Sequence, residues 1–325
     1  MGRRGSLTKT DNFWVGGGIE MADYLITGGC GFVGSHLADA LLARGDGVAV
    51  LDNLSTGKRA NLAPEVRVIE GDVADPDAVA RAIAGCAGVF HLAGIASVAY
   101  CNEHWREGHL TNQTGTVTVF EAAARAGRVP VVYTSSAAVY GDAGPGAVDE
   151  ARVPRPQTAY GVDKLGSELH GRIAMGVHGL PTVGLRPFNI YGPRQDPSSA
   201  YSGVISIFNN RLGQGLPVTV FGDGLQTRDF VFVADVVRFL MAAMARAPHA
   251  AGEVFNICTG RATTLLALVD TLARLHGRVP VVQLGDPRVG DIRESLGDPN
   301  RARTVLGVTA EVTLEDGLAA LLRGA

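Results

Sequence analysis

The sequence predicts an α/β protein with a doubly wound parallel sheet, helices on both of its faces, and a smaller C-terminal α/β domain. Strand-like apolar runs alternate with helical patterns from residue 22 onward, which is typical of a parallel sheet covered by helices. The 43 glycines gather at strand-to-helix junctions rather than in repeats. Beyond Asn189, turn-rich segments interrupt shorter elements, which indicates a second, smaller domain.

The elements follow from the spacing of apolar residues. The first strand leads into a helix that has Val33, Leu37 and Leu41 on one face. The strands expected in the first domain are 22–27, 48–52, 66–70, 88–92, 129–135 and 182–187, and its further helices lie near 76–85, 104–127 and 158–178. In the second domain we expect helices near 203–214, 233–246 and 264–276, and a buried strand at 253–258 that can return to the first sheet.

These elements place a domain boundary near residue 186. The first domain then spans residues 21–186 and the second spans residues 187–325. Residues 1–20 are rich in Gly, Arg, Ser and Thr and lack the apolar segment of a secretory signal. We expect them to be a disordered upstream extension or a remnant of expression.

Composition excludes several classes of function. The net charge of −3 and the pI near 6.2 give no reason to expect nucleic acid or an anionic membrane as a partner. No apolar run reaches the roughly 18 residues of a membrane span. The four cysteines are scattered, which predicts neither a disulfide framework nor a zinc site and favours a reducing, cytoplasmic location. The eight histidines show no paired metal-ligand spacing, so no metal is expected, and His91 is interpreted as a packed core residue.

A glycine-rich loop lies between the first strand and the first helix. Gly28, Gly31 and Gly34 have the spacing that lets backbone approach a pyrophosphate and lets the helix pack closely on the strand. A simple Gly-rich turn is the alternative. The position directly after the first strand favours a dinucleotide site.

Two acidic residues at strand ends extend this site. Asp52 ends the second strand, where an acid binds the adenosine ribose hydroxyls and repels a 2′-phosphate, so NAD is favoured over NADP. Asp72 follows the third strand and can accept a hydrogen bond from the adenine amino group. A turn residue at Asp52 and a helix cap at Asp72 are the alternatives.

Tyr160 and Lys164 stand four residues apart and therefore share one helix face. An ammonium held there stabilises a phenolate, so the tyrosine can act as a base. An ordinary solvated helix face would have the same spacing, so the pair has meaning only beside the other motifs.

Those motifs occur in a fixed order: Gly28-x-x-Gly31-x-x-Gly34, Asp52-Asn-Leu-Ser-Thr-Gly57, His91-Leu-Ala-Gly94, Ser135-Ser136-Ala-Ala-Val-Tyr-Gly141 and Tyr160-x-x-x-Lys164. Together they resemble the extended short-chain dehydrogenases/reductases, and most specifically the UDP-glucose 4-epimerase group, over about residues 21–325. The resemblance implies a Rossmann-type first domain that binds NAD and a second domain that binds a nucleotide sugar. It also implies a homodimer formed by helices 104–127 and 158–178, although the apolar stretch 117–124 could equally face the core.

The resemblance implies a catalytic role for Ser136, Tyr160 and Lys164. Tyr160 would take the proton of the sugar 4-hydroxyl while NAD accepts hydride, and the 4-keto sugar would turn and be reduced on its other face. Lys164 would lower the pKa of Tyr160 and hold the nicotinamide ribose. The residues implied to contact NAD are Gly28, Gly31, Phe32, Val33, Gly34, Asp52, Asn53, Ser55, Thr56, Gly57, Asp72, Val73, Leu92, Ala93, Asn112, Tyr160 and Lys164. Asn112 could instead be a simple helix residue.

The implied substrate is a UDP-hexose, with Ser136 at its 4-oxygen. Asn189 and the two arginines Arg228 and Arg288 match the positions that hold the diphosphate and nucleoside, and Arg suits this because its guanidinium donates two hydrogen bonds to phosphate oxygens. Asp291 would accept from a ribose hydroxyl. Each arginine could instead be a surface residue.

Four positions refine the resemblance. Asp163 replaces the Ser or Thr that family members commonly carry before the lysine, and we expect little effect because adjacent helix residues point apart. Ala137 and Ala138 stand where sugar-nucleotide dehydratases and decarboxylases carry acids, which argues against both chemistries. Ser295 aligns with the gate beside the sugar 2-substituent, so N-acetylated UDP-hexoses are a hypothesis, with an uninformative surface serine as the alternative. A dehydratase, decarboxylase or ketoreductase, or a catalytically idle NAD-sensing protein, are the alternative functions.

Overall fold

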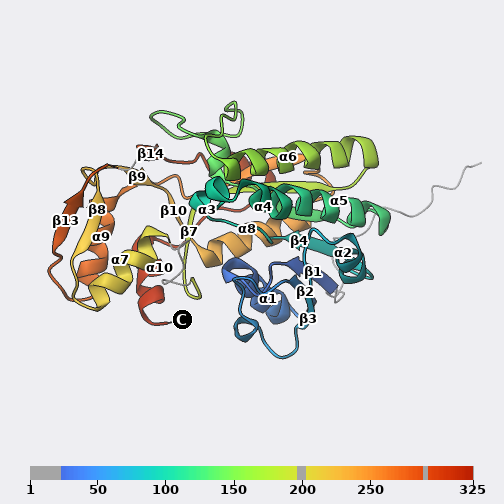
Figure 1. Ribbon diagram of the computed structural model, residues 1–325, viewed down its shortest axis with the longest axis horizontal. Helices are drawn as coiled ribbons and strands as arrows, with labels where there is room; N and C mark the ends of the chain where they lie inside the picture. The colour runs from blue at the N-terminus through green and yellow to red at the C-terminus, as the bar shows by residue number, and fades with distance from the viewer. Residues whose placement is uncertain (1–22, 196–202, 288–291, 325) are drawn as a thin grey trace, which may run out of the picture.

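A seven-stranded parallel sheet forms the centre of the larger lobe in the computed structural model, which describes residues 23–195, 203–287 and 292–324 (Figure 1). Its strands are β1 (Asp23–Thr27), β2 (Gly47–Asp52), β3 (Arg67–Glu70), β4 (Gly88–His91), β5 (Val131–Thr134), β6 (Thr182–Pro187) and β11 (Glu253–Ile257). Their order is β11-β6-β5-β4-β1-β2-β3. The order in which successive strands are added to the sheet therefore reverses between β1 and β4. In α/β sheets the carboxyl ends of the strands at such a point form a ligand crevice. The α/β fold with a doubly wound parallel sheet is confirmed.

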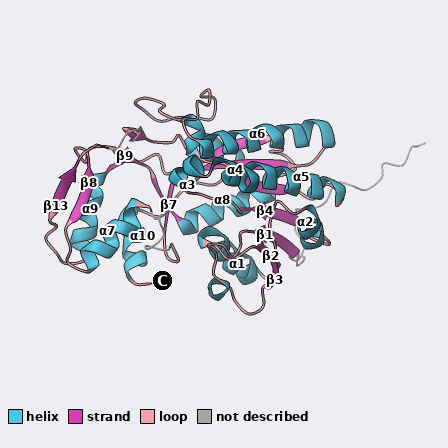
Figure 2. Cartoon of the chain, in the orientation of Figure 1, coloured by secondary structure: helices cyan, strands magenta, loops and turns pink. Residues whose placement is uncertain are grey.

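Helices cover both faces of this sheet (Figure 2). On one face α1 (Phe32–Arg44) packs against α8 (Val233–Arg246), and both share a core with Ile26 and Val50. On the other face α2 (Pro76–Ile83), α5 (Gly115–Arg125) and α6 (Ala159–His178) follow one another, and they share a core with Leu25 and Leu51. Adjacent strand residues thus point to opposite faces, as strand geometry requires. Both faces are apolar because both are buried.

Two elements from the second half of the chain belong to the larger lobe. β11 pairs in parallel with β6, with Phe255 opposite Leu185, and forms one edge of the sheet. Helix α8 covers one sheet face together with α1, and the sequence pattern gave no sign of this.

The region expected as one helix at 104–127 is broken into several pieces. It consists of α4 (Trp105–His109), a π-helical turn η2 (Leu110–Thr114) and α5, and a short helix α3 (Val98–Glu103) that the sequence did not predict precedes it. Asn112 lies inside the π-helical turn, is fully buried, and bonds through its amide to both backbone polar groups of Ile95. π-Helical turns are frequent at functional sites, and here the side chain fixes the loop that follows β4.

The smaller lobe has its own core, which includes Phe208, Val220, Leu268 and Leu318. Its helices are α7 (Val204–Gly213), α9 (Leu265–Leu275) and α10 (Leu314–Leu322), and its strands are β7 (Asn189–Tyr191), β8 (Val218–Phe221), β9 (Thr227–Arg228), β10 (Phe230–Phe232), β12 (Thr263–Thr264), β13 (Val282–Gly285) and β14 (Glu294–Ser295). Short turns η1 (Arg59–Asn61), η3 (Ala137–Tyr140) and η4 (Ala302–Leu306) complete the chain. The helix α10 was not expected from the sequence.

Three expectations lie outside the described residues: those for residues 1–20, for Arg288 and for Asp291. All four cysteines are free and buried. Across the described ranges, no helix combines the length and the apolar character that crossing a membrane requires.

Candidate active site

The glycine-rich loop is held against the loop that follows β4. Gly28 has a φ of 70°, in the left-handed region that favours glycine, and a Cβ placed on it would lie 2.8 Å from the backbone of Ala93. A Cβ on Gly34 would lie 2.5 Å from the carbonyl oxygen of Gly28. The first turn of α1, with Phe32 and Val33, therefore lies directly against β1, and Leu92 and Ala93 lie beside the loop.

Asp52 is enclosed at the end of β2. It is 8% exposed, and its carboxylate accepts hydrogen bonds from the backbone N–H of Cys30, at 2.9 Å, and of Leu54, at 2.8 Å. A Cβ on Gly57 would lie 3.0 Å from both carboxylate oxygens. Because a carboxylate accepts about four hydrogen bonds, Asp52 retains acceptor sites for a pair of hydroxyl groups. These residues fit the adenosine half of NAD.

Asn53 and Asp72 come together across the ends of β2 and β3. The Asn53 amide donates to Asp72 at 3.1 Å, and Asp72 also accepts from the backbone N–H of Ala74 at 2.8 Å. The N-cap of α2 is Asp75, so Asp72 does not cap that helix. Val73 packs under Gly115, and the exposed Ser55 and Thr56 form the outer part of the same loop.

Tyr160 and Lys164 occupy the beginning of α6, where Thr158 is the N-cap and accepts from the backbone N–H of Gly161 at 3.1 Å. The Lys164 ammonium donates to the carbonyl oxygen of Thr134, at the end of β5, at 2.9 Å. The Lys164 nitrogen lies 5.8 Å from the centre of the Tyr160 ring. The two side chains therefore share one helix face, and this face meets the carboxyl ends of the strands.

Burial dominates the electrostatics of this pair. Burial raises the pKa of Tyr160 to about 12, and a hydrogen bond with Ser136 acts in the opposite direction. Burial lowers the pKa of Lys164 to about 8, and the charge of Asp163 opposes that shift. The expected lowering of the Tyr160 pKa is therefore not seen, because burial disfavours the phenolate and raises the pKa instead. The charge of Asp163 acts on the lysine in the direction that keeps it protonated, but burial outweighs it.

Ser136 lies at the start of η3, and a buried ion pair contacts the residues on either side of it in the chain. Arg186 and Glu168 join through two hydrogen bonds of 2.8 and 2.6 Å, and both side chains are at most 6% exposed. Glu168 also accepts from the hydroxyl of Ser135, and Arg186 donates to the hydroxyl of Tyr140 at 2.9 Å. This network connects β5, η3, β6 and α6, the elements that hold Ser136, Tyr160 and Lys164.

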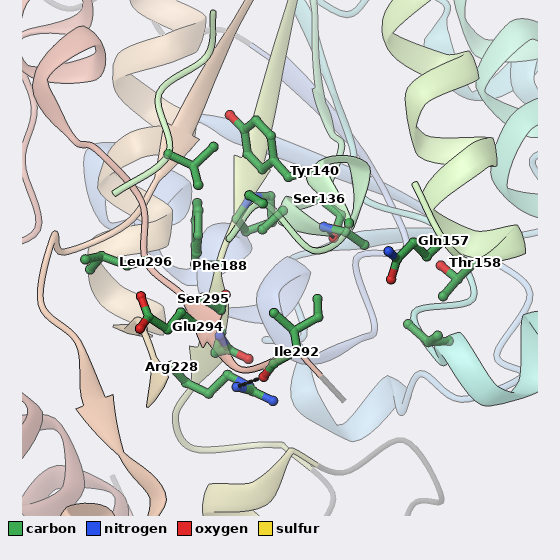
Figure 3. Close-up of a pocket in the computed structure, with 18 of the residues that line it drawn as sticks. Ser136, Tyr140, Gln157, Thr158, Phe188, Arg228, Ile292, Glu294, Ser295 and Leu296 are labelled. Carbon is green, nitrogen blue, oxygen red and sulfur yellow. Dashed lines mark hydrogen bonds between the residues drawn. The ribbon is translucent and has the colours of Figure 1, made fainter. Parts of the chain in front are cut away.

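A cavity of about 550 Å³ opens between the two lobes next to Ser136 (Figure 3). Four of the predicted substrate residues line it, namely Ser136, Asn189, Arg228 and Ser295. Arg228 and Ser295 face each other in the register of β9 and β14. The Asn189 amide donates to the carbonyl oxygen of Asp229 at 3.3 Å. The structure thus brings together residues that lie far apart in the sequence.

Several wall residues were missed by the sequence analysis. Among the described residues these include Asn102, Gln157, Thr158, Phe188 and Glu294. The helix-cap pattern at Thr158 could have placed it beside Tyr160. Nothing in the sequence could have indicated Asn102, because α3 was not predicted.

His91 is a core residue. It is 2% exposed, and its ring nitrogens lie 2.7 Å from the hydroxyl of Thr27 and 3.0 Å from that of Thr116. Burial lowers its pKa to about 3, so the ring is neutral. No cluster of three or more potential metal-ligating side chains occurs in the part of the chain that the structure describes.

Several known proteins with a similar sequence and fold are named as nucleotide-sugar enzymes. A sequence model of the NAD-dependent epimerase/dehydratase family matches residues 24–258. The chain is 37% identical to a UDP-glucose 4-epimerase of Mycolicibacterium smegmatis over 307 residues, covering 91% of this chain and 96% of that protein. It is also similar to a crystal structure of the Thermotoga maritima UDP-glucose 4-epimerase with UDP-glucose, with a TM-score of 0.88, 37% identity, and coverage of 93% and 98%.

Relatives with a different chemistry are nearly as similar. A dTDP-glucose 4,6-dehydratase of Streptomyces venezuelae, solved with NAD bound, has a TM-score of 0.85 and 31% identity, with coverage of 93% of this chain and 96% of that one.

Proposed function

This chain belongs to the NAD-dependent epimerase/dehydratase family, and we propose that within it the protein is a 4-epimerase of UDP-hexoses that works through a transient 4-keto sugar. NAD is the cofactor of the family, and the enclosed Asp52 and the glycine-rich loop fit its adenosine and pyrophosphate parts. The activity is that of an isomerase, as in the epimerases to which the chain is similar.

One observation carries the choice of epimerisation over elimination. Ala137 and Ala138 follow Ser136 in the cavity wall and bring no acid to the reacting centre. The one carboxylate among the described wall residues belongs to Glu294, which lies beside Ser295, away from Ser136, and accepts from the backbone N–H of Gly146 (Figure 3). Eliminating water from a sugar needs an acid and a base in addition to the tyrosine, and this wall does not supply them.

Three residues of the chain, Ser136, Tyr160 and Lys164, handle the proton of the sugar 4-hydroxyl. When bound, NAD would supply a group that takes up a hydride and returns it, and its oxidised form would also supply a positive charge. Tyr160 removes the proton of the sugar 4-hydroxyl as a phenolate and returns it after the sugar has turned. Ser136 hydrogen-bonds Tyr160 and aligns the 4-oxygen with it. Lys164, fixed by the Thr134 carbonyl, adds the positive charge that a buried phenolate requires.

The second lobe binds the nucleotide diphosphate. We assign this role to Asn189 and Arg228 because they line the same cavity as Ser136. The Arg228 guanidinium is held by the carbonyl oxygens of Thr227 and Ile292, each at 2.8 Å. An arginine positioned in this way is suited to phosphate oxygens. Arg288 and Asp291 remain proposals for the same ligand.

The decisive experiment offers the purified protein four substrates: UDP-glucose, UDP-N-acetylglucosamine, UDP-glucuronate and dTDP-glucose. We expect the anomeric proton signal of UDP-galactose to appear from UDP-glucose, without net NADH and without release of water or CO2. Accumulation of a 4-keto-6-deoxy sugar or release of CO2 would instead identify a dehydratase or a decarboxylase.

Ser295 is proposed to leave room for an N-acetyl group, so that UDP-N-acetylhexoses are substrates as well. Ser295→Tyr is then expected to lower the ratio of activities on UDP-N-acetylglucosamine and UDP-glucose by about tenfold, because the larger side chain fills the space at the sugar 2-position. Parallel kinetics on the two sugars measure this ratio. Ser295→Ala is the control that should preserve it, and an unchanged ratio in Ser295→Tyr would refute the role.

A homodimer is proposed through α6. The stretch 117–124 is mostly core-facing, with Val119 and Phe120 buried, so it does not supply the apolar surface. Instead α6 exposes Leu169 and Ile173, at 53% and 54%, four residues apart on one face. Light scattering should give a dimer for the native chain and a monomer for Leu169→Glu/Ile173→Glu. Val279→Glu, at a 92% exposed apolar residue of the other lobe, is the control expected to remain dimeric.

Two broader assignments complete the proposal. Residues 21–186 would bind NAD and residues 187–325 the nucleotide sugar, with β11 and α8 returning to the first part. The four free, buried cysteines are typical of a reducing compartment, which supports a cytoplasmic location.

A further inference from the structure

Asp163 is a buried carboxylate next in sequence to Lys164. The residue is 1% exposed. One oxygen accepts from Nδ1 of His109, the last residue of α4, at 2.8 Å, and this side chain of His109 is half exposed. The other oxygen is buried without a hydrogen-bond partner among the described residues. An unsatisfied buried carboxylate is costly, so its presence here needs an explanation.

The contact with His109 belongs to a wider attachment of the α3–α4 segment to the start of α6. Asn102, on α3, accepts from the backbone N–H of Ala159 at 3.0 Å. His109 binds Asp163 one turn further along α6. Asn102 also lines the cavity. The carboxylate is therefore held in place from a second element, and it cannot turn toward solvent without breaking that contact.

Lys164 has few other charges around it. Its titratable neighbours are Tyr160 on the same helix, Cys101 on α3 and His91 on β4. His91 is neutral, and burial raises the pKa values of Cys101 and Tyr160, so both are protonated near neutral pH. Of the described groups that act on Lys164, the acidic one is therefore Asp163, whose charge favours the ammonium. The lysine is 4% exposed and has little water to stabilise its ammonium.

We propose that Asp163 is a positioning residue that acts through Lys164: anchored by His109, its buried carboxylate keeps the lysine an ammonium in a closed site. The proposal deepens the proposed function, since it rests on Lys164 being needed as a cation beside Tyr160. The cost of the unsatisfied oxygen is then offset by the attraction between the carboxylate and the lysine ammonium, since opposite charges favour each other's charged forms.

The composition of the chain makes this directly measurable. The sequence contains only three lysines, Lys9, Lys58 and Lys164. Protein labelled with [ε-¹³C]lysine therefore gives three side-chain signals, which Lys9→Arg and Lys58→Arg assign. A pH titration of the Lys164 signal follows its protonation without requiring turnover.

Asp163→Asn is expected to lower the midpoint of the Lys164 titration by about one pH unit, because a negative charge that stabilises the ammonium is removed. Asp235→Asn is the control. Like Asp163, Asp235 is a buried helix residue paired with a basic side chain, here that of Arg238, but it lies on α8. It should leave the Lys164 signal unmoved. If Asp163→Asn does not fold, Asp163→Ser serves the same test.

A second readout follows from the sign of the effect. Activity that needs protonated Lys164 is lost as the pH rises through the lysine pKa, so the alkaline limb of the kcat/KM profile should move to lower pH in Asp163→Asn. An unchanged Lys164 midpoint overturns the proposal whatever the activity. Failure of the proposed function would look different: the unsubstituted protein would show the expected Lys164 titration but would not epimerise UDP-glucose.

Discussion

Tyr160→Phe is expected to lower kcat for UDP-glucose epimerisation by about 10²- to 10⁴-fold, the range that a positioned acid–base group contributes. The change removes one hydroxyl and keeps the ring, so the packing of α6 against the strand ends is preserved. Lys164 keeps its bond to the Thr134 carbonyl. Initial-rate kinetics together with NAD titration should therefore show lost turnover with retained cofactor binding.

Tyr24→Phe provides a matched control for this result. Tyr24 is a buried tyrosine in β1, packed on Phe90 and away from the cavity. It should lose no more than about twofold in kcat, since it takes no part in proton transfer. Substantial turnover in Tyr160→Phe would show that another group, with Ser136 the first candidate, removes the proton. Loss of NAD binding in the same variant would show that its effect is not specific to the chemistry.

Glu168→Leu is expected to reduce the free energy of unfolding by about 3–5 kcal/mol, because it leaves the Arg186 guanidinium buried without its anion. Arg186 is 3% exposed. Burial by itself would lower its pKa, but the hydrogen bonds and charge of Glu168 more than offset this and raise the pKa. Urea unfolding followed by circular dichroism measures the loss.

The exposed ion pair between Glu121 and Arg125 on α5 is the natural comparison, with side chains 54% and 74% exposed. Glu121→Leu should change the free energy of unfolding by about 1 kcal/mol or less, since water screens such pairs. The double variant Glu168→Leu/Arg186→Met should recover part of the loss, because it removes the unpaired charge. Equal effects of Glu168→Leu and Glu121→Leu would contradict a structural role for the buried pair.

The sequence predicted most of the larger lobe because its elements are periodic and bounded by clear signals. The strands of the main sheet were placed to within about two residues, and β6 and α8 were bounded as the structure has them. Local patterns failed where tertiary contacts decide the conformation. The π-helical turn at Asn112 is stabilised by a bond to Ile95, seventeen residues away, which no helical period reveals.

The candidate site shows the same division. Gly28, Asp52, Tyr160 and Lys164 were identifiable because their spacing along single strands and helices has a chemical meaning, whereas Ser136 followed from the family resemblance. The wall formed by Arg228 and Ser295 depends on the pairing of β9 with β14, which joins distant segments. The short strands of the smaller lobe have too few residues to show a period, so their pairing could not be predicted.

The sequence alone determined the class of fold, the nucleotide loop and the tyrosine–lysine pair, because each depends on spacing within one element or between neighbouring elements. Only the tertiary structure decided how those groups are charged. Burial sets the pKa of Tyr160 and of Lys164, and burial is a property of everything packed around a side chain. For the same reason only the structure gave Asp163 a role, since its anchor, His109, comes from another helix.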